Sequence, residues 1–214
     1  MKNLVFILVI GLMFSTMNPV CAQYTSKEVR KTLKMKPPRE IKKQAKDYEK
    51  QGYYEAIGAM SIERQLSNAW MREVETDEQG YPKYIVATGS SVGETQIAAK
   101  LQATEAAKLE LAGTIATNVA ALIENNIANS QLNTEEAASV TKTIAASKNI
   151  IAQELGMVIP LVELYKDINK NREANVRIAY NSEVAMEMAK RIIRKSLEDE
   201  TNILQNKLEK LMKF

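Results

Sequence analysis

The residues with the clearest capacity for chemistry lie where a short strand-like run meets an alanine-rich segment. They are Gly89, Ser90, Ser91, Gly93 and Thr95. If a helix begins here, its first backbone N–H groups lack intrahelical partners and favour a bound anion. Two interpretations stay open: a loop that binds an anionic ligand, and a turn that needs glycine for its dihedral angles and for close packing. Because neither Gly-Lys-Ser/Thr nor G-x-G-x-x-G is present, we favour the turn.

Missing residue types limit the reactions open to the chain. The sequence has no histidine and a single cysteine, Cys21. A mature chain that has lost Cys21 cannot build ordinary zinc, haem or iron–sulfur sites, and it has no imidazole base or thiolate nucleophile. The adjacent Glu135 and Glu136 point apart on a helix, and no other spacing identifies a converging acidic pair. We therefore expect a non-enzyme without metal or cofactor; a hydrolase that uses carboxylates is the enzymatic alternative.

Residues 1–22 have the pattern of a secretory signal peptide. Lys2 supplies the positive end, residues 4–14 form the apolar run, and Val20-Cys21-Ala22 fits a cleavage site before Gln23. The run is shorter than the ~20 residues that a membrane-spanning helix needs. We expect cleavage after Ala22 and export to the periplasm or outer membrane. Lipidation of Cys21 is the main alternative, although Val20 departs from the small residue usual before an acylated cysteine; a retained anchor is the other.

The charge balance gives a weak indication of partners. The formal net charge is +3, with 26% charged residues. This is too small to indicate nucleic-acid binding or strong membrane adsorption, and it leaves room for a peripheral membrane contact. The lysines between residues 31 and 46 are interspersed with acids, so we favour a solvated helix face over a patch for anionic envelope components.

An α+β core is predicted for residues 79–181. Residues 84–88 are β-branched and aromatic, and 94–127 form one long alanine-rich helix interrupted only by Gly113. Residues 157–166 and the alternating run 175–180 predict a hairpin, with Pro160 at an edge or bulge. The expected fold is a small, mostly antiparallel sheet of about three strands, packed by long helices.

Residues 23–78 predict a basic, helical N-terminal extension. Pro38 suits the start of one helix, and Ser61 suits the cap of a second. Trp70 on the second helix is expected to anchor the core, because large aromatic side chains dominate core burial. The polar run 75–80 is the predicted boundary with the core domain.

The C-terminal region, 182–214, predicts a single long helix that docks on the core and protrudes. Another helix, capped by Thr134, precedes it. Two interpretations remain for the end of the chain: packing on its own domain, or a self-association seam at coiled-coil spacing. The seam residues are Leu197, Leu204, Leu208 and Leu211.

The order of these features resembles a known family. Gly89-Ser90-Ser91 after the strand, the helix with Ala107-Lys108-Leu109-Glu110-Leu111-Ala112, the hairpin and the closing helix are similar to the lipoprotein-20-like family of bacterial envelope proteins. That family is also similar to the N-terminal domain of a flagellar assembly protein. The likeness spans approximately Tyr84 to Leu197, and the whole chain resembles secreted proteins of Bacteroides-type bacteria. The resemblance implies an α+β envelope domain of unknown biochemical role.

These observations favour a non-catalytic envelope protein with a structural or protein-interaction role. The expected partners are envelope proteins, or a second copy bound through the C-terminal helix. The alternative is a periplasmic module that binds a small ligand or anion through residues 89–93.

Overall fold

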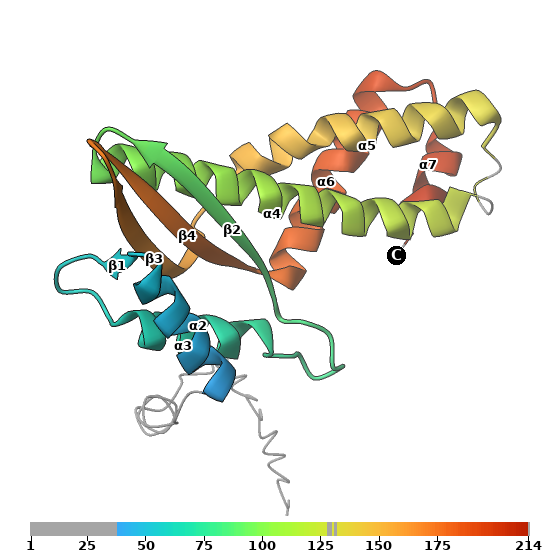
Figure 1. The fold of residues 1–214 in the computed structure, drawn as a ribbon. Helices are drawn as coiled ribbons and strands as arrows, with labels where there is room; N and C mark the ends of the chain where they lie inside the picture. Colours follow the sequence, from blue (N-terminus) through green and yellow to red (C-terminus); the bar gives the residue numbers. More distant parts are fainter. Residues whose placement is uncertain (1–37, 128–129, 131, 214) are drawn as a thin grey trace, which may run out of the picture. The chain divides into compact units, whose positions relative to one another are not determined.

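A computed structural model describes residues 38–127, 130 and 132–213 of the chain (Figure 1). The predicted signal peptide, including Cys21, and the start of the predicted extension lie outside these residues. The elements, in chain order, are α2 (Arg39–Lys50), β1 (Tyr54–Glu55), α3 (Ile62–Glu73), β2 (Tyr84–Gly93), α4 (Gln96–Ile127), α5 (Thr134–Glu154), β3 (Ile159–Ile168), β4 (Asn171–Asn181), α6 (Ser182–Glu200) and α7 (Gln205–Leu211).

The strands form one antiparallel sheet in the order β1-β3-β4-β2. The predicted β3–β4 hairpin is confirmed, and it turns through Asn169, whose φ of 55° suits asparagine better than most residues. The register shifts between Pro160 and Val162, so proline lies at a bulge as predicted. The sheet has four strands instead of about three, because the short β1 pairs with β3. The α+β class is confirmed.

Helix α4 covers one face of the sheet, against β2 and β4 (Figure 1). The predicted turn at residues 89–93 is wrong: these residues continue β2 to Gly93 and pair with β4. Glycine is required there for close packing. A Cβ at position 89 would lie 2.1 Å from the carbonyl oxygen of Ala103 and 2.4 Å from the amide nitrogen of Ala107. The predicted long helix is confirmed, and its alanines are what allow this approach.

Helices α2 and α3 cover the opposite face, seen below the sheet in Figure 1. Ile41 of α2, Leu66 of α3 and Leu164 of β3 belong to one buried core cluster there. Residues 37–214 form one compact unit, so the predicted boundary after residue 78 does not separate two domains. Both predicted helix starts are confirmed, at Pro38 and at Ser61, whose side chain accepts a hydrogen bond from the Arg64 amide.

Two details of this region differ from the predictions. Trp70 is not a core anchor, since it is 36% exposed; the buried stripe of α3 follows Ile62, Leu66 and Ala69 instead. The polar run 75–80 forms an ordered loop, in which Asp77 accepts hydrogen bonds from the amides of Gln79 and Tyr81. The loop therefore returns the chain to β2 within one unit.

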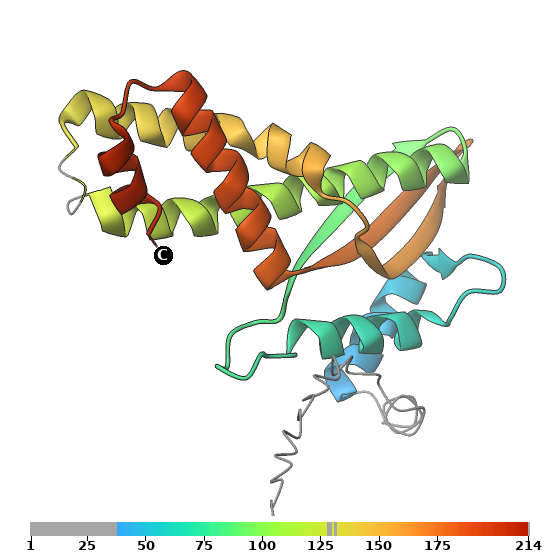
Figure 2. The ribbon, with the colours of Figure 1, turned by 180° about the vertical axis from the view of Figure 1, so that it is seen from behind.

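The last part of the chain is two helices, not one. Helix α6 ends at Glu200, where three successive acidic residues oppose the negative end of the helix dipole and Thr201 donates its hydroxyl to the Leu197 carbonyl. Helix α7 then folds back, and Asn126 of α4 donates to the Leu211 carbonyl. Helix α5 is confirmed, with Asn133 instead of Thr134 as its cap. Helices α5, α6 and α7 thus pack around the second half of α4 (Figure 2).

We predict that Gly89→Ala destabilises the protein by at least about 2 kcal/mol, because overpacking a close helix–strand contact forces the backbones apart. Gly156→Ala is the matched control, since a Cβ there meets nothing within 4 Å. Urea unfolding followed by circular dichroism measures both. Equal stability of the two variants would contradict the close contact.

The fold-back of α7 gives a second prediction. Leu208 is 1% exposed and Leu204 is 62% exposed. We expect Leu208→Ala to lower the free energy of unfolding by about 2–5 kcal/mol. Leu204→Ala should change it by less than about 0.5 kcal/mol. Similar losses at both positions, measured by urea unfolding, would indicate a continuous helix with a different buried face.

Candidate interaction surface

The predicted anion loop does not form the required geometry. Gly89, Ser90, Ser91 and Gly93 lie in an extended strand, so their amides do not converge at a helix start. Ser90 accepts a hydrogen bond from the Asn175 side chain of β4. Ser91 and Thr95 also form hydrogen bonds within the protein. Ser91 donates to Gln102 at 2.8 Å, and Thr95 accepts from the Ala98 amide at the start of α4.

The predicted self-association seam is divided between the core and the surface. Leu197, Leu208 and Leu211 are all buried in the main core cluster, and Leu204 alone is exposed. Lys207 of α7 pairs with Glu136 at 2.8 Å, which lowers the pKa of that carboxyl through the hydrogen bond. Three of the four leucines therefore stabilise the monomer, and this seam cannot join two chains without unfolding α7.

Acidic residues near the hairpin are engaged by tyrosines and cations. Tyr165 donates its hydroxyl to Glu163, and Lys100 of α4 lies 2.7 Å from the other carboxylate oxygen of Glu163. Burial, followed by the hydrogen bond to Glu163, raises the pKa of Tyr165 to about 12. A phenol with this pKa stays protonated at neutral pH and acts as a donor to the carboxylate, not as a base.

The strand β1 is held by the same kind of contact. Tyr54 donates to Asp167 at 2.8 Å and accepts from Arg172 at 2.7 Å, while Tyr53 donates to Glu173 at 2.9 Å. Burial and the Glu173 contact raise the pKa of Tyr53 to about 12. Among the described residues, no group of three or more acidic side chains is placed to hold a metal ion. These charges tie β1 to the hairpin.

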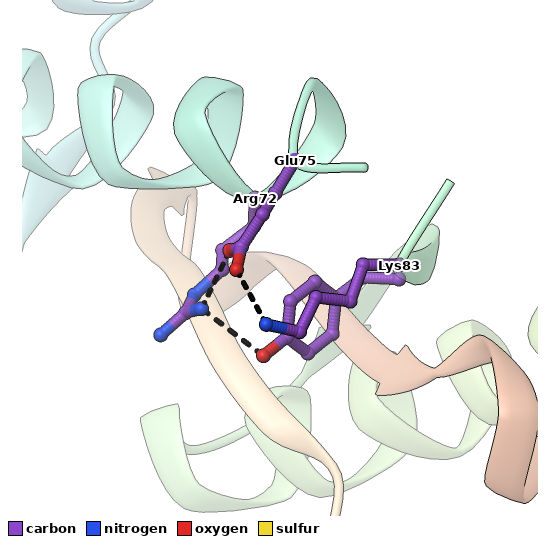
Figure 3. Close-up of polar contacts among 4 residues, drawn as sticks. Arg72, Glu75 and Lys83 are labelled. Atoms are coloured by element: carbon purple, nitrogen blue, oxygen red, sulfur yellow. Dashed lines mark hydrogen bonds and ion pairs between the residues drawn. The ribbon is translucent and has the colours of Figure 1, made fainter. Parts of the chain in front are cut away.

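A second polar cluster joins the end of α3 to the start of β2 (Figure 3). Glu75 accepts from Arg72 and from Lys83, each at 2.8 Å, and Arg72 also donates to the Tyr84 hydroxyl at 3.1 Å. The Arg72 guanidinium lies 4.9 Å from the Tyr84 ring centroid, a cation–π distance. This cluster fixes the 75–83 loop against the sheet.

A groove between α4 and α5 is one of the concave surfaces of the described residues. Its volume is about 320 Å³, and only residues of these two helices line it. Small and aliphatic side chains line its apolar floor, namely Ala116, Ala120, Ile123, Val140 and Ile144, and all of these except Ala120 are at most 7% exposed. Helices α6 and α7 lie on the other side of the α4–α5 pair, as the two opposite views show (Figures 1 and 2). We call this solvent-facing surface the α4–α5 face.

One cation and one anion flank the groove. The Lys148 amine of α5 lies over α4, with its nitrogen 3.1 Å from the position that a Cβ on Gly113 would occupy. Glu124 lines the groove further along α4. Neither Lys148 nor Glu124 forms a hydrogen bond or ion pair with another residue in the described part of the chain. The face therefore combines an apolar floor with two separated, unpaired charges.

Sequence reasoning did not identify this face. In the sequence, Gly113 is only an interruption of the long alanine-rich helix, and Lys148 and Glu124 lie far apart. One signal was present: Gly113, Thr117 and Ala120 repeat small residues at helical spacing on the side of α4 away from the buried stripe. The partner helix that turns this side into a groove follows from tertiary packing.

Helix α4 is long and apolar enough to cross a membrane by length and composition. It is the one such helix in residues 38–127, 130 and 132–213, and 39% of its apolar window is buried within the protein. The buried core helix of a soluble protein meets the same criteria. Since α4 packs on the sheet, we interpret it as a core helix, and the location of the protein stays a prediction.

Comparisons with known proteins give no relative. No family model, no curated protein and no solved structure matches the chain. The resemblance to the lipoprotein-20-like family therefore stays a prediction.

The raised tyrosine pKa values predict an alkaline loss of stability. An unfolded tyrosine titrates near pH 10, and folded Tyr53 and Tyr165 titrate at about 12. Between these values the folded state holds more protons than the unfolded state, so stability falls as pH rises from 10 to 12. Tyr165→Phe should make this fall shallower, and the exposed Tyr81→Phe should not. Denaturant midpoints across this range measure the effect; identical slopes for all three proteins would contradict it.

Proposed function

We propose that this protein is a non-catalytic component of a bacterial cell envelope that acts by binding protein through its α4–α5 face. Export is inferred from the pattern of residues 1–22. A binding role is inferred from the contacts of the acidic side chains and from the α4–α5 face.

The available chemistry supports binding over catalysis. The sequence lacks histidine, and its single cysteine falls in the predicted signal peptide. Glu163, Asp167, Glu173 and Glu75 each accept from a tyrosine or pair with a cation. General acid–base work by two carboxylates requires a facing pair across a cleft. These acids instead hold strands and loops together.

One observation carries the proposal. The α4–α5 face is concave, has an apolar floor and is bordered by Lys148 and Glu124, which form no hydrogen bond or ion pair within the described residues. Protein interfaces place apolar groups at the centre and charged groups at the rim. A groove bounded by two helices also suits a packed helix, because ridges of one helix fit grooves of another. The alternative anion-binding module lacks this support, since residues 89–93 form a strand.

A photoreactive amino acid at Thr141, on the groove, tests the proposal in the native host. We expect discrete protein adducts from Thr141, and none from a photoreactive residue at Lys142, which is exposed but does not line the groove. Ala120→Trp fills the groove, so it should reduce the Thr141 adducts to the Lys142 level.

Folding of the Ala120→Trp variant is checked by its thermal unfolding. Adducts of equal yield from Thr141 and Lys142, or adducts that persist in a folded Ala120→Trp variant, would contradict binding at the α4–α5 face.

A further inference from the structure

We propose that the α4–α5 face binds a second copy of this chain, forming an antiparallel dimer in which Lys148 faces Glu124 of the partner subunit. The inference rests on the proposed function and names the partner. It follows from where the two unpaired charges lie and from the symmetry of a pair of identical chains.

The first step is the position of the cation. Gly113 has no side chain, so the Lys148 stem crosses onto α4 and its nitrogen lies above Gly113. The ammonium and Glu124 are therefore both placed over α4, on the groove side. They are eleven residues apart along this helix, roughly 16 Å at about 1.5 Å per residue.

The second step is symmetry. A two-fold axis that lies in the interface and crosses α4 midway between Gly113 and Glu124 exchanges the two ends of the face. Each Lys148 then meets Glu124 of the partner subunit, so one dimer contains two such ion pairs. A parallel arrangement would instead place each charge next to its own copy. Any other partner needs opposite charges at the same spacing, which the second copy provides by symmetry.

The third step is the fit at the centre. The same axis places Thr117 opposite Ala120 of the partner subunit, because both pairs are centred on the same point of α4. Thr117 is exposed and Ala120 is half-buried, and both are small. Small side chains at a crossing point allow two helices to approach closely.

The size of the face sets the expected strength. From Gly113 to Ile127, α4 runs roughly 22 Å, and two packed helices are about 20 Å wide. The resulting area of roughly 440 Å² per chain is about half that of a standard interface. We therefore expect a reversible dimer with a dissociation constant in the micromolar range, weakened by salt because its charges lie at the rim.

Sedimentation equilibrium of the purified protein, from about 1 to 500 µM, tests this. We expect a monomer–dimer equilibrium. Lys148→Glu and Glu124→Lys each place like charges together at two symmetric contacts, and each should weaken the dimer at least about tenfold. The double variant restores opposite charges and should recover wild-type dimerisation. Lys142→Glu, which changes the net charge equally outside the groove, should have little effect.

Crosslinking gives a positive test of the register. With Cys21 absent or replaced, Thr117→Cys should form covalent dimers with a short bismaleimide, because the two copies of this position lie offset by only about 4.5 Å along the helix. Lys142→Cys, on the same helix pair but outside the groove, should give none.

The outcomes separate this inference from the proposed function. A protein that stays monomeric up to the highest concentration, or a double charge variant that is not rescued, would overturn the dimer. If the Thr141 adducts then contain a different protein, the binding role of the face stands and only the identity of the partner changes. Loss of the Thr141 adducts as well would overturn both.

Discussion

The structure depends on how closely α4 approaches β2. Gly89 faces the backbone of Ala103 and Ala107, and Gly93 faces Ala99, at distances that no Cβ could tolerate. Dispersion energy and apolar burial grow with the number of close atomic contacts. Glycine on the strand and alanine on the helix at these contact positions therefore allow an unusually tight contact. That contact fixes the direction of a 32-residue helix, and the positions of the other helices follow from it.

Because α4 is longer than the sheet, its second half needs other partners. Helices α5, α6 and α7 supply them, and the buried leucines of α7 belong to the same core cluster as the part of α4 on the sheet. Helices α6 and α7 pack on one side of the α4–α5 pair only. The opposite side, which carries Lys148 and Glu124, stays exposed to solvent. A helix too long for its sheet thus produces both a second lobe of the core and an open surface.

The polar side chains have a consistent role. Tyr53, Tyr54 and Tyr165 each donate to a carboxylate, and the clusters around Glu163 and Glu75 add lysine or arginine. Such contacts are specific in direction, and at exposed positions each contributes little to stability. Their effect is to set the register of β1 and of the 75–83 loop against the sheet. Charged groups thus position the edges of the sheet, and apolar groups form the centre of the protein.

The sequence by itself determined the class and most of the elements. The β3–β4 hairpin, the helix starts at Pro38 and Ser61, and the long alanine-rich helix follow from local dihedral preferences and periodicity. Tertiary structure decided three features. Gly89 lies in a strand and is needed for close packing instead of for a turn, because it contacts the backbone of a helix that is more than ten residues away in sequence. Trp70 is exposed, because α3 buries a different stripe against the sheet. Leu208 and Leu211 are core residues, because α7 reverses after Glu200. The α4–α5 face belongs with these features: Gly113, Glu124 and Lys148 carry ordinary local signals, and only the packing of α5 against α4 brings the charges of Glu124 and Lys148 onto one surface.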